Sequence, residues 1–374
     1  MSKRSTAFPR PDRLLAAILL LAAAALLATS PAQAAERATT AITAERGQDP
    51  QFSATAPEAF WTQARIKAAK PLPFYDDDAD LAKGKGPEVP PVAGPPGLTE
   101  GGRPRLKPPV PPVTSSGEES PSPAGAAPTG AALLGTQNVG DNTFLNRDTT
   151  LWTSYPWVTI GKVFFTTVGG DNSYCSASVI SGNSIIVTAA HCCWDRGADQ
   201  PNSNFTFAPA IRENTAPFGM YSFREGRILT AWRTGGGRPN DVCVLRLNPR
   251  GDGQPVSSVV GWLGRSWNHD PTQHHFSFGY PSALEGGNYK YECTAESYAN
   301  CGDGQVLAMG CNMTFGSSGG PWVRTFKKFE AGAVNQVNGV VSGYDDCTGT
   351  FGQSFNGPRF TSNNIVPLCT AIGC

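Results

Sequence analysis

From residue 135 to residue 374 the chain is a succession of short runs rich in β-branched and aromatic residues, separated by Gly, Asn, Asp and Pro. The clearest runs are 158–167, 177–179, 184–188, 242–247, 276–280 and 339–342. No apolar repeat with the period of a helix persists in this half, and the high content of glycine (42) and proline (32) also disfavours a helical bundle or coiled coil. Short strands with closely spaced turns are typical of a sandwich or of one or two barrels. We therefore expect residues 135–374 to form an all-β domain.

The N-terminus has the three parts of a secretory signal peptide. Basic residues precede an unbroken apolar run over residues 14–28, and the small residues Ala32 and Ala34 follow it. This run is shorter than the roughly 20 residues that span a bilayer, which disfavours the alternative of a membrane anchor. We expect residues 1–34 to be a signal peptide cleaved after Ala34, and the mature protein to be secreted, extracellular and free of the membrane.

Two further segments separate the signal peptide from the β domain. Within residues 35–86, which we expect to be a propeptide, an apolar patch over residues 60–69 predicts a short amphipathic helix that ends before Pro71. Thirteen prolines lie between Pro87 and Pro128, so residues 87–134 are expected to be an extended Pro/Gly-rich linker. A binding role for this linker, as an anchor to a cell wall or a partner, stays open beside that of a spacer.

Charge and cysteine usage exclude several classes of function. Lys and Arg balance Asp and Glu at 30 each, so the chain carries no electrostatic footprint for nucleic acid. Ten cysteines in a secreted chain predict disulfides, and none lies in a C-x-x-C pair. A zinc site at His191 with the neighbouring cysteines is the alternative, but adjacent residues rarely face one tetrahedral centre. We expect no metal and no cofactor.

Three segments carry the residue types that nucleophilic catalysis needs. His191 follows a buried-looking strand, Asp241 begins an apolar strand, and Ser318 lies in the glycine-dense turn 316–320. A serine hydroxyl needs an adjacent base, which histidine supplies near neutral pH, and a buried carboxylate fixes the imidazole tautomer. Glycines beside the serine leave backbone N–H groups free to bind a developing oxyanion.

The order of these residues along the chain excludes one class of hydrolase. Residues 316–320 also fit the G-x-S-x-G turn of α/β-hydrolases, in which the histidine follows the serine. All histidines precede Ser318 here, namely His191, His269, His274 and His275. An α/β-hydrolase triad is therefore excluded.

Three motifs resemble those of chymotrypsin-like serine proteases, in the same order. They are T-A-A-H-C at 188–192, N-D-V at 240–242 and G-S-S-G-G-P at 316–321, and the resemblance covers the chain from about residue 155 to its end. It implies an all-β fold of two perpendicular six-stranded β-barrels, with the active site in the cleft between them. It also implies polypeptide substrates, and we expect a monomer.

The resemblance assigns a role to each residue of the site. It implies that His191 is the general base, that Asp241 orients it and that Ser318 is the nucleophile. The backbone N–H groups of Gly316 and Ser318 would form the oxyanion hole. The same resemblance implies a disulfide between Cys175 and Cys192, which match the pair that closes the loop before the histidine.

Departures from the family pattern concern activation and specificity. Ser317 stands where the family usually has an aspartate. A residue other than aspartate at this position most resembles the bacterial secreted glutamyl-endopeptidase branch, whose members are also made with a propeptide. Where that branch has threonine and histidine, this chain has Met313 and Val341, so the sequence does not support glutamate specificity. Asn312 at the pocket floor offers no charge partner for arginine or lysine.

We therefore expect a neutral substrate pocket, to which the resemblance assigns Asn312, Met313, Val341, Ser342 and Tyr344. The function expected is a secreted serine endopeptidase, made as a preproprotein and acting through an acyl-enzyme. The alternative is a catalytically inactive, protease-like binding protein. Loss of His191, Asp241 or Ser318 would mark that alternative, and all three are present.

Overall fold

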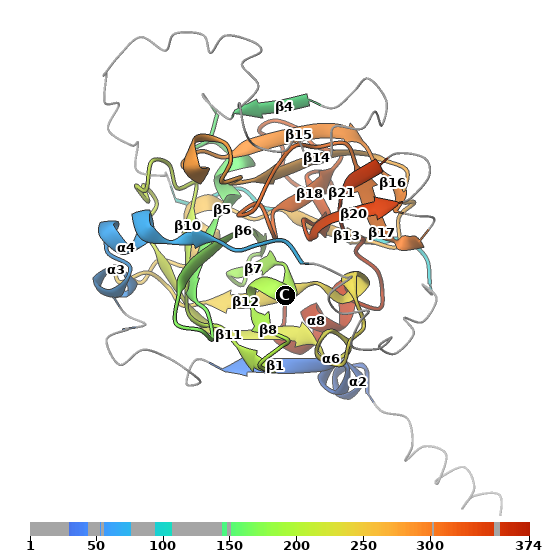
Figure 1. Ribbon diagram of the computed structural model, residues 1–374, viewed down its shortest axis with the longest axis horizontal. Coiled ribbons are helices and arrows are strands. Elements are labelled where there is room, and N and C mark those ends of the chain that lie inside the picture. The colour runs from blue at the N-terminus through green and yellow to red at the C-terminus, as the bar shows by residue number, and fades with distance from the viewer. Residues whose placement is uncertain are drawn as a thin grey trace, which may run out of the picture.

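The computed structural model describes residues 30–43, 53, 56–75, 94–106, 144–147, 151–300, 303–347 and 352–374. Residues 1–29 of the expected signal peptide and most of the expected linker lie outside the described residues. The described chain is mostly β-structure, in two halves (Figure 1). No described helix combines the length and the apolar character that crossing a bilayer requires.

The first half is a closed barrel of six antiparallel strands (Figure 1). Its strands in order around the ring are β5 (Ile160–Thr166), β6 (Asn172–Ser181), β7 (Ile185–Thr188), β12 (Cys243–Leu247), β11 (Tyr221–Leu229) and β10 (Ser203–Pro209). The pairing of β10 with β5 closes the ring. The runs expected at 158–167, 184–188 and 242–247 become β5, β7 and β12. The expected barrel is therefore present in this half.

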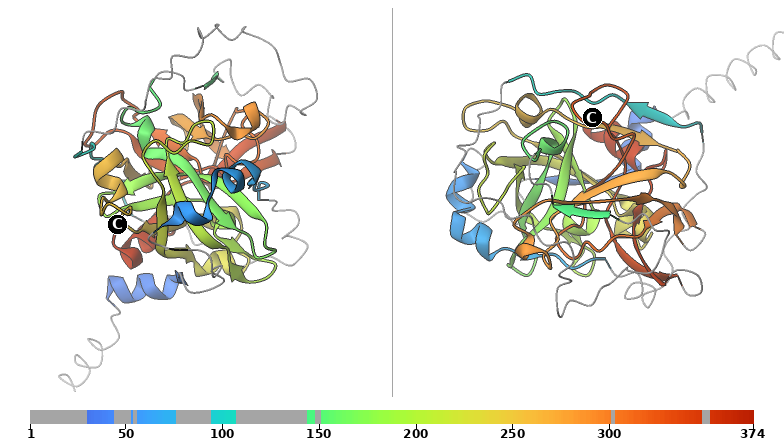
Figure 2. Two further views of the ribbon diagram at one scale, coloured as in Figure 1. Left: turned by 90° about the vertical axis from the view of Figure 1, so that its left-hand side faces the viewer. Right: turned by 90° about the horizontal axis from the view of Figure 1, so that it is seen from above.

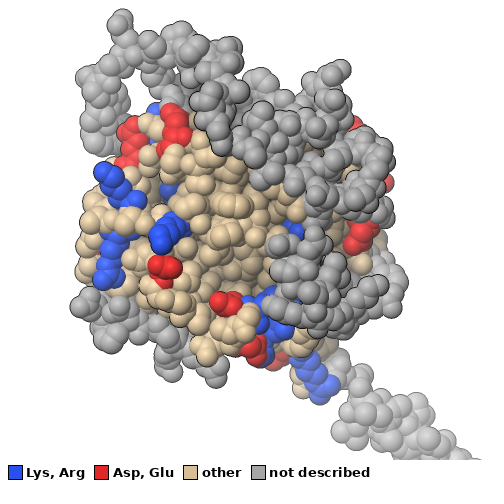
Figure 3. Space-filling model, viewed as in Figure 1, with Lys and Arg blue, Asp and Glu red and all other residues tan. Residues whose placement is uncertain are grey.

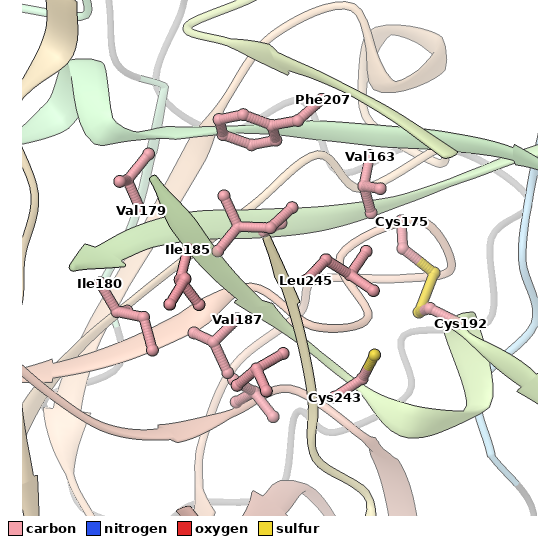
Figure 4. Close-up of a cluster of buried hydrophobic side chains, with 14 of the residues drawn as sticks. Val163, Cys175, Val179, Ile180, Ile185, Val187, Cys192, Phe207, Cys243 and Leu245 are labelled. Atoms are coloured by element: carbon pink, nitrogen blue, oxygen red, sulfur yellow. A yellow bond between two sulfur atoms is a disulfide. The ribbon is translucent and has the colours of Figure 1, made fainter. Parts of the chain in front are cut away.

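Alternation along each strand fills the barrel interior with apolar side chains. Val163, Val187, Phe207 and Leu245 are each at most 1% exposed and point into one cluster (Figure 4). The next residue along β5, Phe164, belongs to a different buried cluster. Because side chains of a strand alternate between its two faces, the barrel has apolar side chains on its outer face too, and this face must be covered.

The second half contains two sheets. A seven-stranded sheet has the order β3 (Gly97–Thr99), β13 (Gly264–Trp267), β19 (Gln336–Val340), β18 (Pro321–Arg324), β14 (His274–Gly279), β15 (Tyr291–Glu296) and β4 (Phe144–Arg147). A four-stranded sheet has the order β16 (Tyr298–Asn300), β17 (Asp303–Met309), β21 (Gly352–Pro358) and β20 (Gly343–Cys347). Hydrogen bonds between the described strands do not close a second six-stranded barrel, because β3 takes the outer edge of β13 and β17 pairs with β21.

Segments before residue 107 pack on both halves, which composition alone does not indicate. α2 (Pro31–Ala38) leads into β1 (Thr39–Thr43), which pairs with β11 at the side of the first barrel (Figure 2). β2 (Lys70–Pro71) pairs in parallel with β6. β3 lies within the expected linker, yet it pairs with β13. A Cβ on the nearby Gly102 would lie 2.2 Å from the Trp262 ring, so close packing requires glycine there.

The apolar patch 60–69 forms parts of two helices rather than one. α3 (Pro57–Phe60) and α4 (Gln63–Ala68) are separated at Thr62, whose side chain accepts a hydrogen bond from the backbone N–H of Arg65 and caps α4. Trp61 is 1% exposed, its ring lies 5.4 Å from that of Phe164, and its Nε1 donates to the carbonyl of Asn204. The patch therefore covers the outer face of the first barrel.

A C-terminal helix, α8 (Ile365–Ile372), is the largest departure from the all-strand expectation. At eight residues it is too short for an apolar helical period to stand out in the sequence. The Asn364 side chain caps its first N–H, and a disulfide joins Cys369 to Cys374 at its end. The remaining short elements are η1 (Trp157–Thr159), η2 (Ala190–Cys192), β8 (Trp194–Asp195), β9 (Gln200–Pro201), α6 (Thr230–Arg233), η3 (Arg238–Asn240), α7 (Val256–Val260) and η4 (Glu285–Gly287).

Lys162 on β5 is a buried amine with no carboxylate partner among the described residues. It is 3% exposed, and its Nζ lies 4.0 Å from the centre of the Tyr174 ring. Burial lowers the pKa of Lys162 to about 7. Between about pH 7 and 10.5 the unfolded chain therefore holds a proton that the native state lacks, so native stability rises with pH across this window.

We expect Lys162→Met to raise the free energy of unfolding most below about pH 7, and progressively less as pH rises towards 10.5. The pKa difference sets an upper limit of about 5 kcal/mol, part of which the Tyr174 ring offsets. Thermal denaturation at pH 6 and pH 9 measures the effect. Lys327→Met, on a side chain that is 56% exposed, is the matched control. A Lys162→Met protein no more stable than the parent at pH 6 would contradict this account.

Candidate active site

The pairing of β7 with β12 brings His191 and Asp241 together. His191 lies on η2 just after β7, and Asp241 lies just before β12. These strands are antiparallel neighbours, so the end of one lies beside the start of the other. His191 Nδ1 lies 2.8 Å from Asp241 Oδ2, and the backbone N–H of His191 donates to Oδ1 at 2.8 Å. The carboxylate thus holds both the ring and the main chain of the histidine.

Asp241 is fully buried and stays ionised. Burial opposes its ionisation, but the neighbouring His191 and hydrogen bonds from His191 and Ser342 outweigh burial and lower the pKa of Asp241. Ser342 Oγ donates to Oδ2 at 2.5 Å. Ser342 was expected in the substrate pocket, yet its side chain bonds the aspartate. The signal missed in the sequence was a small hydroxyl on a buried strand end, which can reach a carboxylate.

The glycine turn places Ser318 against the segment that carries His191. Gly319 has φ +76°, and a Cβ there would lie 1.9 Å from Thr188 Oγ1 and 2.7 Å from the backbone nitrogen of Ala189. Only glycine permits this approach, because both the positive φ and the contact exclude a side chain. The backbone N–H of Ser176 donates to the carbonyl of Ser318 at 2.8 Å, which ties the turn to β6.

Two polar atoms in this region are buried and without a hydrogen-bond partner among the described residues. They are Ser318 Oγ and His191 Nε2. A buried polar atom without a partner is costly and calls for an explanation, of which a catalytic role is one. Because Asp241 binds Nδ1, the free ring nitrogen is the one that a serine hydroxyl would need as its base.

Some backbone N–H groups in the turn donate a hydrogen bond to a carbonyl, and others have no acceptor among the described residues. Those of Ser317, Gly319 and Gly320 donate to the carbonyls of Thr314, Val341 and Ser317. Within the described part of the chain, those of Gly316 and Ser318 donate to no acceptor. A Cβ on Gly316, at φ +91°, would lie 2.6 Å from the Tyr174 ring. Ser317, at the position that is usually aspartate, is buried and its Oγ donates to the carbonyl of Thr314.

Two disulfides hold the two residues that directly follow His191. Cys175 is joined to Cys192 (Figure 4). Cys193 is joined to Cys243 on β12. The first closes a sequence separation of 17 residues and restrains the unfolded chain by roughly 3 kcal/mol in the chain-entropy model. A third joins Cys293 to Cys311. The sulfurs of Cys175 and Cys192 lie within 4.8 Å of a His191 nitrogen, but they are bonded to each other and offer no thiolate to zinc.

The expected pocket residues are brought together only in part. Met313 and Val341 are fully buried in one cluster, which also contains Trp322 and Phe355. Tyr344 packs against this cluster, and its hydroxyl donates to the carbonyl of Met313. Burial raises the pKa of Tyr344 well above its ordinary value, so the hydroxyl remains a donor. Asn312, the residue before Met313, is half-buried.

Residues 70–75 run across the front of the molecule and reach this site (Figure 1). After β2, the backbone N–H of Tyr75 donates to the carbonyl of Ser342 at 3.2 Å. The Tyr75 ring is stacked 6.4 Å from the His191 ring at an interplanar angle of 23°, and lies 4.7 Å from the Trp232 ring. Most of the surface that the described residues present on this side is uncharged (Figure 3).

Phe74 and Tyr75 are site residues that sequence reasoning missed. Phe74 lies 5.3 Å from the Phe315 ring and 5.0 Å from the Tyr344 ring, between ring centres. The expected contact from the N-terminal region was the patch 60–69, which instead covers the barrel wall. The available signal was an aromatic pair between Pro73 and a run of aspartates, in an otherwise polar segment.

Comparisons with known proteins agree with this geometry. Residues 175–328 match the family model of the trypsin-like peptidase domain. No curated protein matches the chain. The structure resembles protease Anisep from Arthrobacter nicotinovorans (29% identity, 57% of this chain and 96% of that chain, TM-score 0.48). It also resembles the thermostable serine protease AL20 from an extremophilic microorganism (27% identity, 56% and 95%, TM-score 0.50).

A Glu endopeptidase solved in complex with MPD shares the fold at 18% identity, over 63% of this chain and 99% of that chain, with a TM-score of 0.50. The matched residues 175–328 include His191, Asp241 and Ser318. Family model and fold thus agree with the arrangement of β7, β12 and the glycine turn. Residues 175–328 are therefore similar to a trypsin-like peptidase domain.

Proposed function

We propose that the protein is a secreted, monomeric serine endopeptidase that acts through His191, Asp241 and Ser318. One observation carries the proposal: the buried carboxylate of Asp241 holds His191 Nδ1 at 2.8 Å, while His191 Nε2 and Ser318 Oγ remain buried without partners among the described residues. The trypsin-like peptidase domain supplies the reaction class, hydrolysis of polypeptides. The test is the Ser318→Ala variant: without the serine hydroxyl, it must no longer hydrolyse casein.

The geometry gives each group a step in an acyl-enzyme mechanism. Ser318 Oγ attacks the carbonyl carbon of the scissile bond while His191 Nε2 takes its proton. The oxyanion accepts hydrogen bonds from the N–H groups of Gly316 and Ser318. His191 then gives the proton to the leaving amine, which breaks the C–N bond and leaves an ester on Ser318. Water, deprotonated by His191, hydrolyses the ester and restores the serine hydroxyl.

The same proposal includes synthesis as a preproprotein whose N-terminal region keeps the site closed. Tyr75 supports this role, since it is 9% exposed, faces the His191 ring and binds the carbonyl of Ser342. Trp61 and its neighbours support it too, because they pack on the outer face of the first barrel and so hold in place the part of the chain that leads into residues 70–75. Activation then consists of removing or displacing residues 70–75. Ser317 has no carboxylate to capture a new N-terminus, so activation needs no ion pair at that position.

We expect Tyr75→Ala to raise the activity of the unprocessed chain about 10- to 100-fold. The substitution removes a buried aromatic ring, which contributes roughly 1.5–3 kcal/mol to holding the segment in place, and each 1.4 kcal/mol is tenfold. Hydrolysis of a fluorogenic peptide measures the effect, with gel electrophoresis showing that the chain stays intact. Leu98→Ala, on an exposed side chain of β3, is the control and should change nothing. An unprocessed Tyr75→Ala chain no more active than the parent would contradict the closed-site account.

A further inference from the structure

Residues 57–69, which we call the wall segment, form an apolar cover on the outer face of the first barrel (Figures 1 and 2). Three of its side chains, Phe60, Trp61 and Ile66, are each at most 4% exposed. They share one buried cluster with Phe164, Tyr174, Ala208, Ile211, Met220 and Tyr280. Without the cover this apolar face would meet water, and soluble proteins rarely expose such a contiguous apolar patch. The wall segment is therefore packed as part of the domain.

The wall segment reaches the glycine turn through two aromatic rings. The Trp61 ring lies 5.4 Å from the Phe164 ring, which in turn lies 6.3 Å from the Tyr174 ring. A Cβ on Gly316 would lie 2.6 Å from the Tyr174 ring, so this ring limits where the Gly316 backbone can lie. The N–H of Gly316 is one of the two donors proposed for the oxyanion. Tyr174 therefore packs directly behind the proposed oxyanion hole.

Strand β6 also connects the covered face to the turn by hydrogen bonds. Tyr174 and Ser176 lie two residues apart on β6 and so share a face. Ser176 Oγ donates to the carbonyl of Gly316 at 2.9 Å and accepts from the N–H of Tyr280 at 3.0 Å. The Tyr174 hydroxyl lies 3.5 Å from the carbonyl oxygen of Tyr280. A displacement of Tyr174 would therefore disturb the contacts that fix Gly316.

Residues 70–75 differ from the wall segment in where they lie. Tyr75 stacks on the His191 ring at the site, whereas Trp61 and its neighbours belong to the cluster on the barrel wall. Freeing the site therefore requires only residues 70–75 to leave. Because the first cysteine of the chain is Cys175, no disulfide can hold the wall segment after a cut beyond residue 75. Packing on the wall and the pairing of β1 with β11 would hold the fragment at two places.

We propose that the wall segment is a permanent part of the active enzyme. It stays on the barrel after the cut that frees the site and, by holding Tyr174 against Gly316, keeps the oxyanion donor in place. The inference rests on the proposed peptidase function and gives the N-terminal region two opposite roles: residues 70–75 close the site, and residues 57–69 support it. Tyr174 is a positioning residue, because it acts through the backbone of Gly316.

The first experiment tests retention on the full chain carrying Tyr75→Ala, with a recognition sequence for a site-specific protease inserted between residues 75 and 94. After cleavage, size-exclusion chromatography and intact-mass measurement show which fragments stay together, and a fluorophosphonate titrates reactive serine. We expect the N-terminal fragment to co-elute with the catalytic domain in a complex that titrates. Elution of the catalytic domain without the fragment would overturn the inference. Failure of the cut protein to titrate would instead refute the proposed function, and the inference with it.

The second experiment tests positioning with Trp61→Ala in the same cut protein. We expect kcat per titrated serine on a fluorogenic peptide to fall about tenfold while KM stays nearly unchanged. The oxyanion forms only after substrate has bound, and removal of a whole oxyanion-hole donor costs about 10²–10³ in kcat. Trp61→Phe keeps a ring against Phe164 and should restore most of kcat.

Ile42→Ala is the matched control for this test. Ile42 is as buried as Trp61, at 1% exposed, and lies on β1 of the same N-terminal region, so its truncation should lower stability without changing kcat. Ile66→Ala, a milder truncation within the wall segment, should lower kcat by less than Trp61→Ala does, and it serves where Trp61→Ala does not fold. Equal losses of kcat in Ile42→Ala and Trp61→Ala would indicate a general structural effect and overturn the positioning role. Parental kcat in Trp61→Ala would overturn it as well.

Discussion

The Ser318→Ala variant is expected to lose turnover by a factor on the order of 10⁶, which is the cost of removing the nucleophile from a serine, histidine and aspartate unit. Residual hydrolysis over water would come from the unused N–H groups of Gly316 and Ser318 and from substrate binding. Turnover of casein or a peptide nitroanilide by the processed protein measures the loss. The fold should survive, because a methyl group replaces a hydroxyl that has no hydrogen-bond partner among the described residues.

The neighbouring serine gives a matched control for this prediction. Ser317 is equally buried and lies in the same turn, but its Oγ donates to the carbonyl of Thr314. Ser317→Ala should therefore cost one hydrogen bond and lower activity no more than about tenfold. Wild-type turnover by Ser318→Ala would refute the triad. Absence of hydrolysis in the unsubstituted processed protein would favour the alternative of a protease-like binding protein.

The motifs of the site could be predicted from sequence because each one is local. The strand ending at Thr188 and the strand beginning at Cys243 are both recognisable, and their pairing register brings Cys243 opposite Thr188. That register alone places His191 beside Asp241, so the prediction did not require any knowledge of contacts between distant side chains. The glycines at 316 and 319 likewise indicate a turn in which a Cβ at either position would clash with neighbouring atoms.

The parts that sequence could not predict depend on contacts between distant segments. Nothing in the composition of residues 94–106 distinguishes a free linker from β3, because that strand is defined only by its pairing with β13. Because β3 occupies the outer edge of β13 and β17 pairs with β21, the described strands of the second half do not form the closed six-stranded barrel that was expected. The contact of Tyr75 with His191 joins residues 116 positions apart, and two aromatics in a polar segment do not identify their partners.

Asp241→Asn is expected to lower turnover about 10⁴-fold, the second largest effect, although it changes a single oxygen to nitrogen. The amide is nearly isosteric, so packing around this fully buried side chain should survive. What changes is the hydrogen-bond pattern at His191 Nδ1 and at Ser342 Oγ, since the present oxygen accepts from both. An amide nitrogen there would donate instead, which leaves Nδ1 as the acceptor and puts the ring proton on Nε2. His191 could then no longer take the proton of Ser318.

Comparison with Ser342→Ala separates orientation from charge. That variant keeps the Asp241 carboxylate and both of its bonds to His191. It removes the hydrogen bond that Ser342 Oγ donates to Asp241 and the longer one, 3.3 Å, that it accepts from Arg238. We expect it to lower turnover no more than about tenfold, because one donor to a still-paired carboxylate contributes roughly 1.5 kcal/mol. Measured kcat for both variants, with near-identical circular dichroism spectra, makes the comparison. A loss below tenfold in Asp241→Asn would mean that this carboxylate does not set the tautomer of His191, and the proposed division of roles would have to be abandoned.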